Sequence, residues 1–203
     1  MTIQLKNDRL IFVTQNRHKL MEAKQIFAAN RLSIPLAGLD SLGFSGDIPE
    51  VHDTLEENAI AKSNFVYRKY GCDCFADDTG LEVHALDGRP GVYSARYAGA
   101  EGIAADNIAK LLNELHGVVD RTAQFRTVIS LILNKKEYLF EGVVYGEILT
   151  HPIGEMGFGY DPVFKPAGHH TSFSAMDVAT KNSISHRYHA LIKMIDFLLA
   201  IHK

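Results

Sequence analysis

The feature that most constrains the fold is a pair of long neighbouring segments in which apolar and polar residues alternate. The segments span residues 123–133 and 137–149, and only Asn134-Lys135-Lys136 separates them. A period of two is typical of β-strands, and a connection this short joins two antiparallel strands in a hairpin. The chain is therefore expected to contain a sheet with at least one antiparallel pair.

Shorter apolar runs before this hairpin predict three buried strands, at residues 10–13, 72–76 and 81–86. The second of these runs ends in Asp77-Asp78-Thr79-Gly80. Four helices are predicted from apolar residues at helical spacing. The first follows residue 16, and the second runs from a capping box at residues 53–57 to about Tyr70. The third covers residues 104–116, and the last begins near Ser183.

Because helices and strands alternate early and a hairpin follows, the predicted class is α/β with a mixed sheet. A chain of 203 residues suits one domain, or one domain with two lobes.

Charge and hydropathy narrow the range of partners. The formal net charge is −3, and acidic and basic residues are spread along the chain, which disfavours a nucleic-acid polymer as ligand. The N-terminus lacks the pattern of a secretory signal, and the most apolar C-terminal stretch, 191–201, is too short to span a bilayer. We therefore expect a cytoplasmic protein with no membrane partner.

The two cysteines predict no cross-link and no zinc site. Cys72 and Cys74 are separated by one residue, and we expect their side chains on opposite faces of a strand, which disfavours a disulfide between them. No compact cluster of Cys and His suggests zinc. Reduced thiols are the expected state.

Two polar clusters after predicted strands suit a phosphorylated ligand bound with magnesium. Thr14-Gln15-Asn16-Arg17-His18-Lys19 lies where a strand gives way to a helix, whose N–H groups and dipole bind phosphate oxygens. Asp77 and Asp78 offer carboxylates to Mg²⁺, joined by Glu50 and Glu22 if the fold brings them close. Taken singly, the first cluster is more simply a helix cap and the second a solvated turn.

Two later clusters suit a flat ligand. Glycines on both sides of Phe158, within residues 154–162, let the backbone approach a base and present the ring for stacking. A phenylalanine that plugs the core explains these glycines equally well. Lys181, His186 and Arg187 gather at the start of the last helix, where cations are mildly unfavourable, so an anionic or carbonyl-bearing ligand is suspected there.

Together these segments resemble the family of inosine triphosphate pyrophosphatases, also called dITP/XTP or Ham1-like pyrophosphatases. The resemblance covers nearly the whole chain and rests on five stretches in the family's order: TQNRHKLMEA, IPEVHDTLEENAIAKS, FADDTGLEVHALDGRPGVYSARYAG, GEMGFGYDPVFKP and KNSISHRYHAL. It implies a single domain over residues 1–203, in which an elongated mixed α/β sheet, flanked by helices, floors a cleft between two lobes. It also implies a homodimer.

The resemblance further implies an enzyme that hydrolyses ITP, dITP and XTP, which are non-standard purine nucleoside triphosphates, to the monophosphate and pyrophosphate, and so cleanses the nucleotide pool. Asp78 matches the proton acceptor, Glu50 and Asp78 match ligands of Mg²⁺, and Asp77 and Glu22 match supporting carboxylates. The matching substrate-binding positions are Thr14, Gln15, Asn16, Arg17, His18, Lys19, Lys62, Thr79, Phe158, Gly159, Tyr160, Asp161, Lys181, His186 and Arg187. Residues 169–180 depart from the pattern because they lack the acidic run common in relatives, which affects the expected conformation of that loop.

Two other functions stay open. A related pyrophosphatase of the Maf-like kind would act on a modified pyrimidine or on 7-methylguanosine triphosphate, whereas Phe158 with His186 and Arg187 favours a purine. A non-catalytic nucleotide sensor would not need an apparatus for metal and water. The carboxylates at positions 50, 77 and 78 therefore favour an enzyme.

Overall fold

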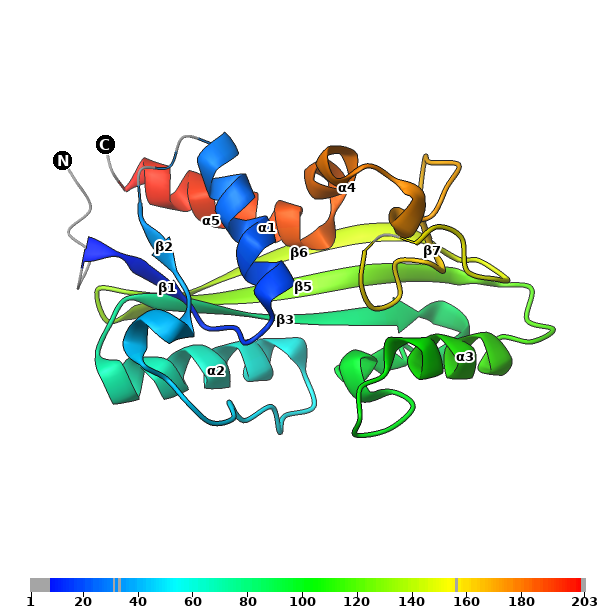
Figure 1. The fold of residues 1–203 in the computed structure, drawn as a ribbon, viewed down its shortest axis with the longest axis horizontal. Coiled ribbons are helices and arrows are strands. Elements are labelled where there is room, and N and C mark those ends of the chain that lie inside the picture. The colour runs from blue at the N-terminus through cyan, green and yellow to red at the C-terminus, as the bar shows by residue number, and fades with distance from the viewer. Residues whose placement is uncertain (1–7, 31, 33, 156, 202–203) are drawn as a thin grey trace. The chain divides into compact units, whose positions relative to one another are not determined.

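The structure, a computed structural model, describes residues 8–30, 32, 34–155 and 157–201. Its strands are β1 (Leu10–Phe12), β2 (Leu36–Ala37), β3 (Cys74–Val83), β4 (Pro90–Gly91), β5 (Thr122–Leu133), β6 (Lys136–Ile148) and β7 (Phe164–Pro166). Its α-helices are α1 (Arg17–Ala29), α2 (Leu55–Tyr70), α3 (Ala104–Glu114), α4 (Val178–Ile184) and α5 (His186–Ala200). The strands form one sheet in the order β2-β1-β3-β5-β6-β7, with β4 paired to β3 (Figure 1).

Both pairing directions occur in this sheet, so the predicted mixed α/β class is confirmed. β1 lies parallel to β2 and to β3, with Ile11 opposite Cys74. β4 and β7 pair antiparallel with β3 and β6. β5 and β6 are neighbours joined only by Asn134 and Lys135, both with positive φ, so they form the predicted hairpin.

The chain divides into two compact units, each with its own core. Unit 1 comprises Met1–Asp78, Thr127–Gly142 and Arg187–Lys203, and unit 2 comprises Thr79–Arg126 and Val143–His186. The long strands β3, β5 and β6 supply residues to both units.

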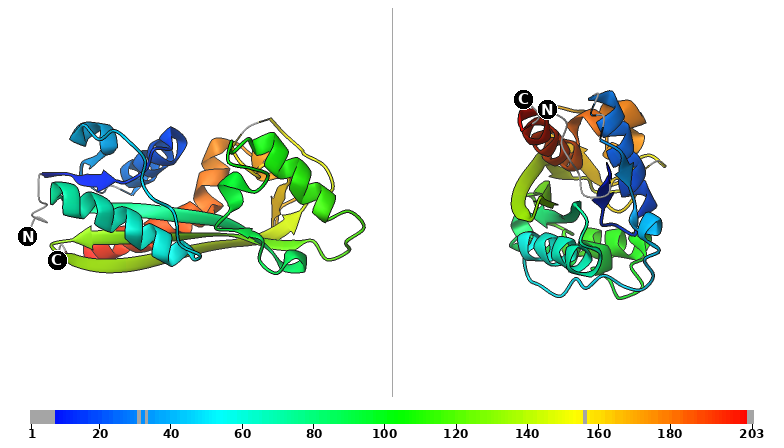
Figure 2. Two further views of the ribbon diagram at one scale, coloured as in Figure 1. Left: turned by 90° about the horizontal axis from the view of Figure 1, so that it is seen from below. Right: turned by 90° about the vertical axis from the view of Figure 1, so that its left-hand side faces the viewer.

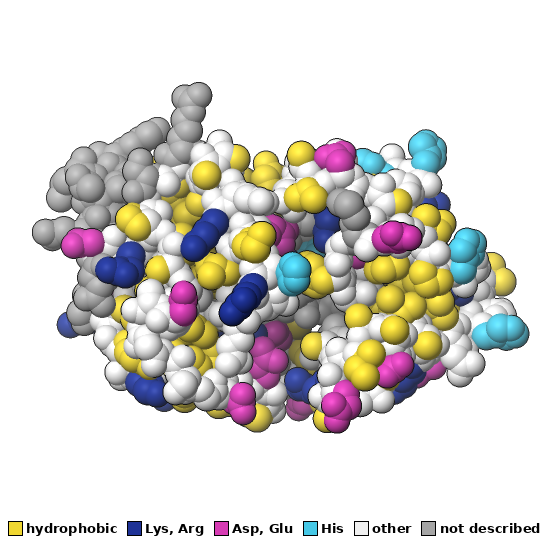
Figure 3. All heavy atoms as spheres, viewed as in Figure 1, with side chains coloured by type: hydrophobic (Ala, Val, Ile, Leu, Met, Phe, Trp, Pro, Cys, Tyr) yellow, Lys and Arg dark blue, Asp and Glu magenta, His cyan; other side chains and the backbone are white. Residues whose placement is uncertain are grey.

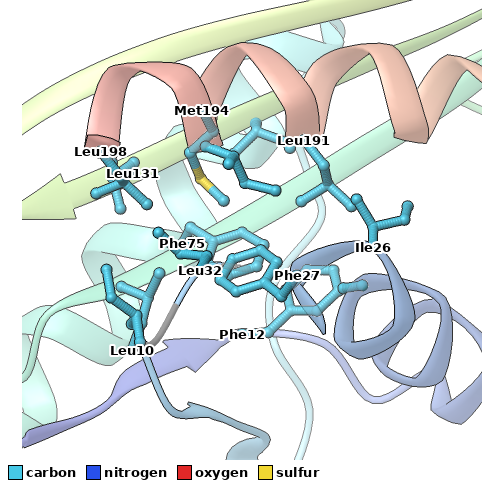
Figure 4. Packing of buried hydrophobic residues seen from close by; sticks show 14 of the residues in the cluster. Leu10, Phe12, Ile26, Phe27, Leu32, Phe75, Leu131, Leu191, Met194 and Leu198 are labelled. Carbon is cyan, nitrogen blue, oxygen red and sulfur yellow. The ribbon is translucent and has the colours of Figure 1, made fainter. Parts of the chain in front are cut away.

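In unit 1, helices cover both faces of the sheet, with α1 and α5 on one side and α2 on the other (Figure 2). Phe12 and Phe75 face α1 and α5, and their rings stack with centroids 4.4 Å apart (Figure 4). Ile11 and Ala76, one position along each strand, pack with Val66 of α2. Successive strand residues point to opposite faces, so a continuous apolar run packs against the helices on both sides of the sheet in unit 1.

Unit 2 has a core in which α3 packs on the sheet. Leu111 of α3 is fully buried with Leu81 of β3. Phe125, Phe164 and Phe173 form an aromatic group beside them, and the ring centroids of Phe125 and Phe164 lie 4.7 Å apart.

Strand β3 corrects the prediction of two strands separated at residues 77–80. It runs unbroken from Cys74 to Val83, so Asp77 and Asp78 lie in its middle and not at a strand end. Gly80 permits this course, because a Cβ there would come within 2.7 Å of the Gly91 carbonyl oxygen on β4. The strand can carry two carboxylates internally because cationic side chains compensate them.

The last helix begins later than predicted. α4 is a separate short helix capped by the side chain of Asp177, Ser185 is extended, and α5 starts at His186. Lys181 therefore lies in α4, whereas Arg187 stands in the first turn of α5.

Neither cysteine forms a disulfide, as expected, but the expected geometry was wrong. Cys72 and Cys74 belong to the same cluster on the α2 face, because residues two apart on an extended chain point the same way. The neighbouring Cys72 thiol, together with burial, raises the pKa of the Cys74 thiol far above its ordinary value. The Cys74 thiol therefore stays protonated, and both cysteines act as small core residues.

The surface carries mixed charge. On the face drawn in Figure 3, the basic side chains of the described residues are interspersed with acidic ones and do not gather into one patch. Among the helices of the described part of the chain, none combines the length and apolarity needed to cross a membrane.

Candidate active site

The start of α1 in unit 1 is organised by side-chain hydrogen bonds. Asn16 is the N-cap, and its Oδ1 accepts hydrogen bonds from the backbone N–H groups of His18 at 2.9 Å and Lys19 at 3.3 Å. Thr14 Oγ1 accepts one from the Asn16 N–H at 3.1 Å. These bonds fix the loop after β1 and orient the first turn of the helix that carries Lys19.

The rest of this loop lies nearer the solvent. Gln15 Nε2 donates to the Gly46 carbonyl oxygen at 2.9 Å, which ties the loop to the segment after residue 42. Arg17 and His18 are exposed on the first turn of α1. Lys19 is the cation of this loop that reaches the buried part of the unit.

Lys62 on α2 joins two carboxylates that are distant in sequence. Its Nζ donates to Glu50 Oε1 and to Asp78 Oδ1, at 2.8 Å in each case. Burial would lower the pKa of Lys62, but Asp78 and Glu50 outweigh it and raise the pKa above its ordinary value. Lys62 is therefore an ammonium that the two carboxylates share.

Asp77 has a separate set of partners. Its Oδ1 accepts from Lys19 Nζ at 3.0 Å, and its Oδ2 accepts from Arg187 Nε at 3.1 Å. Arg187 is fully buried and also donates through NH1 to Glu22 Oε2 at 2.6 Å. The structure thus brings Glu22, Asp77 and Arg187 together with Lys19.

We call the seven side chains Glu22, Glu50, Asp77, Asp78, Lys19, Lys62 and Arg187 the charged cluster. The cluster is arranged on both faces of the sheet. Asp77 points to the α1 and α5 side and Asp78 to the α2 side, because neighbours in a strand alternate. Asp77 and Asp78 therefore form their ion pairs with different lysines, Lys19 and Lys62.

Burial and ion pairing shift the pKa values of the two aspartates in opposite directions. Burial would raise the pKa of Asp77, but Lys19 and Arg187 outweigh it and hold the pKa well below its ordinary range. At Asp78 burial prevails over the ion pair with Lys62, so the pKa is raised. Asp77 stays an anion with both oxygens engaged, and Asp78 is the better proton acceptor.

The carboxylates of the cluster fit a magnesium ion that is shared with a ligand. The described residues contain no group of three or more His, Cys, Asp and Glu side chains placed to hold a metal. Glu50 and Asp78 nonetheless converge, since each has an oxygen 2.8 Å from the same Lys62 Nζ. Mg²⁺ typically takes one or two protein carboxylates and completes its shell with waters and phosphate oxygens. This pair suits such an ion and does not suit zinc.

Unit 2 builds a second set of candidate residues around Asp161. Asp161 Oδ2 accepts from the Phe158 backbone N–H at 2.7 Å and from Lys181 Nζ at 2.5 Å. The Lys181 ammonium lies 4.8 Å from the centre of the Phe158 ring. Gly157 has φ 93°, and a Cβ there would collide with Asp161, so the loop requires glycine. Phe158 is half-buried, so it does not plug the core.

The remaining predicted positions of unit 2 are more enclosed. Tyr160 is buried, and its hydroxyl donates to the Ser94 carbonyl oxygen at 2.9 Å. His186 is buried with its ring stacked on Phe125, the centroids 4.7 Å apart. Gly159 and Thr79 are half-buried.

Sequence reasoning missed Asn58. This buried residue of α2 accepts the His52 N–H on Oδ1 at 3.0 Å and donates from Nδ2 to the His52 carbonyl oxygen at 3.2 Å. It thereby holds the segment that carries Glu50. The available signal was a polar side chain on the buried stripe of α2, between Leu55 and Ala59.

Comparisons with known proteins identify the family. The model of the Ham1 family matches residues 10–197. The chain is 51% identical over 193 residues to a dITP/XTP pyrophosphatase of Porphyromonas gingivalis, covering 95% of this chain and 98% of that protein.

Solved structures of similar proteins cover nearly the same length. The Staphylococcus aureus Ham1 protein is 38% identical with a TM-score of 0.85, over 96% of this chain and 100% of that one. A HAM1 protein from Coxiella burnetii is 36% identical with a TM-score of 0.86, over 95% and 98%. The protein described here belongs to the Ham1 family.

Proposed function

We propose that this protein is a nucleoside triphosphate pyrophosphatase that hydrolyses ITP, dITP and XTP to the monophosphate and pyrophosphate. The observation that carries the proposal is the charged cluster, in which Glu50 and Asp78 converge on Lys62 while Lys19 pairs with Asp77. Carboxylates for a divalent ion beside lysines for phosphates are what a magnesium triphosphate needs. The similarity to dITP/XTP pyrophosphatases supports the substrate class.

The lysines are assigned to the triphosphate. Hydrolysis requires the protein to position the phosphates and to offset the charge that builds on the leaving pyrophosphate. Lys19 and Lys62 supply that positive charge, and the N-terminal end of α1 adds its dipole. Glu50 and Asp78 would hold Mg²⁺, which when bound neutralises phosphate charge and polarises the bonds to phosphorus.

Asp78 is assigned as the proton acceptor. Its bonds to the described residues use only Oδ1, so Oδ2 is left to orient a water molecule toward the α-phosphorus and to take its proton. The water oxygen bonds to the α-phosphorus, the bond to the bridging oxygen breaks, and pyrophosphate leaves. Asp77 does not suit this role because both of its oxygens are engaged. We assign it to holding Lys19.

Three residues of unit 2 are assigned to the base, namely Phe158, Asp161 and Lys181. The Phe158 ring offers a stacking surface, which contributes about 1–3 kcal/mol per base. Lys181 carries only donors, so it suits the 6-oxo acceptor of hypoxanthine and xanthine and mismatches the amino group of adenine. A site built on one hydrogen-bond pattern can reject the mismatched analogue by about 10⁴–10⁵.

Arg187 receives a different assignment from the one its sequence position suggested. Its guanidinium is fully buried between Glu22 and Asp77. We therefore assign it to fixing Asp77, and leave base recognition to Lys181 and His186.

We further propose that the enzyme depends on Mg²⁺, works in the cytoplasm and forms a homodimer. The convergence of Glu50 and Asp78 supports the metal. Light scattering coupled to size-exclusion chromatography tests the dimer, and a monomer at micromolar concentration would contradict it.

A substrate panel tests the function. We expect pyrophosphate release from ITP, dITP and XTP with Mg²⁺, loss of release on chelation, and much slower release from ATP. Separate assays for pyrophosphate and orthophosphate identify the bond that is cleaved. Faster hydrolysis of 7-methylguanosine triphosphate or a modified pyrimidine would favour the Maf-like alternative. Tight ITP binding without turnover would favour a sensor.

A further inference from the structure

We propose that Lys62 stands in the place of the metal ion in the nucleotide-free protein, so that metal binding requires its ammonium to leave Glu50 and Asp78 for the phosphates. This inference rests on the proposed function and adds a coupling between metal and nucleotide at that site.

The first observation is the position of the ammonium. Lys62 Nζ lies 2.8 Å from both Glu50 Oε1 and Asp78 Oδ1, and the Lys62 side chain is only 5% exposed. These two carboxylates are its ion-pair partners, and they are also the two that fit a magnesium ion. The lysine therefore occupies the point at which the two carboxylates converge.

A magnesium ion and the Lys62 ammonium conflict in both distance and charge. Magnesium binds carboxylate oxygens at about 2.0–2.1 Å and demands near-octahedral geometry. An ammonium already held by the same two oxygens blocks that approach sterically and repels the divalent ion. Metal and ammonium thus compete for Glu50 and Asp78.

The displaced Lys62 ammonium needs a new anionic partner. A buried cation that loses its partners is strongly unfavourable unless another anion replaces them. The triphosphate is such an anion, and it also supplies oxygens to the metal. Metal alone should therefore bind weakly, whereas metal with nucleotide should bind well, which is positive coupling between two ligands.

Lys19 shows that this competition is particular to Lys62. Its carboxylate partner is Asp77, which points to the other face of the sheet and is also held by Arg187. Lys19 can meet phosphates without vacating the pair formed by Glu50 and Asp78.

The experiment measures Mn²⁺ binding to the nucleotide-free protein by electron paramagnetic resonance of the free ion. The variants are Lys62→Met and Lys62→Gln, with Lys69→Met as matched control, since Lys69 lies on α2 with its ammonium over the Phe44 and Tyr70 rings. We expect both Lys62 variants to bind Mn²⁺ on the order of 10-fold more tightly than the wild type, within the usual range of coupling factors. The control should match the wild type.

The glutamine variant guards against a folding failure, and one further double variant locates the site. Lys62→Gln retains amide donors for the carboxylates, so it covers the case in which Lys62→Met fails to fold. Adding Glu50→Gln to Lys62→Gln should abolish the gain in Mn²⁺ affinity if the pair is the site.

Equal or weaker Mn²⁺ binding by folded Lys62→Gln overturns the inference. If the wild type still hydrolyses ITP with Mg²⁺ in that case, the proposed function stands and only the coupling fails. If the Lys62 variants bind Mn²⁺ more tightly but the wild type leaves ITP intact, the competition is supported and the pyrophosphatase is refuted.

Discussion

At the scale of single residues, Asp77 and Asp78 have opposite properties although they are adjacent. The strand turns Asp77 toward Lys19 and Arg187, which engage one oxygen each. It turns Asp78 toward Lys62 and keeps Oδ2 available. Alternation along one strand therefore separates a positioning carboxylate from the proposed proton acceptor.

Acid denaturation should report on Asp77. Its folded pKa lies well below the ordinary value of 3.8, so the unfolded state binds more protons as the pH falls below about 4. The stabilisation is present above this pH and is lost as the pH falls toward the folded pKa. Asp77→Asn should lower the free energy of unfolding at pH 7 and flatten its decline below pH 4, by up to about 1.4 kcal/mol per pH unit. Urea titrations between pH 2 and pH 7 measure this slope, and an unchanged slope in the variant contradicts the assignment.

Asp78→Asn tests the proton acceptor. The amide keeps the size of the side chain but cannot take the proton of the attacking water, so kcat for ITP should fall by about 10²- to 10⁴-fold. The raised pKa of Asp78 also places the acidic limb of the wild-type kcat/KM profile above pH 3.8 in the free enzyme, because activity needs the ionised form. Turnover of Asp78→Asn within a few-fold of the wild type would exclude this role.

At the scale of elements, α2 positions the metal-facing carboxylates. Thr54 caps the helix by accepting the Glu57 N–H at 3.2 Å, and Gly71 ends it in the left-handed conformation. The buried face of α2 presents Lys62 to Asp78. It also presents Asn58 to the backbone of His52. One helix thus holds both the strand and the segment that bring Asp78 and Glu50 together.

Asn58→Ala should loosen the Glu50 segment. The change removes both bonds to the His52 backbone and leaves buried groups unsatisfied, at a cost of about 1–3 kcal/mol in stability. The Mg²⁺ concentration that gives half-maximal activity should rise several-fold, with a smaller change in kcat at saturating Mg²⁺. Asn64→Ala is the control, since Asn64 on the same helix bonds Ile60 and Glu137 instead. Equal Mg²⁺ dependence in both variants would show that Asn58 is only structural.

Elements with local signals were predictable from sequence, whereas those set by distant partners were not. The Thr54 cap and the Asn134-Lys135 hairpin follow from residues a few positions apart. The continuity of β3 through Asp77 does not, because the compensating Lys19 and Arg187 lie 58 and 110 positions away. The sequence indicated Lys19, Lys62, Asp77 and Asp78 as site residues. It did not indicate which lysine pairs with which aspartate, because that depends on the face of β3 to which each aspartate points.

At the scale of the whole molecule, two cores depend on the same three strands. β3 supplies Phe75 to the core beneath α1 and α5 in unit 1, and Leu81 to the core beneath α3 in unit 2. β5 likewise supplies Leu131 to unit 1 and Phe125 to unit 2. Loss of either core leaves one half of each strand without the packing that stabilises it. We therefore expect the two units to unfold together.

Leu111→Ala tests this cooperativity from a position in unit 2 outside the proposed site. Leu111 is fully buried on α3, and truncation of such a leucine costs about 2–5 kcal/mol because a cavity remains. In urea, far-ultraviolet circular dichroism, tyrosine fluorescence and the loss of ITP hydrolysis should show one common midpoint, shifted to lower urea. Leu139→Ala, at a side chain 47% exposed on β6, should leave the midpoint nearly unchanged. If activity and circular dichroism instead separate, so that the charged cluster of unit 1 survives while unit 2 melts, the shared strands do not couple the cores, and the units are independent in stability.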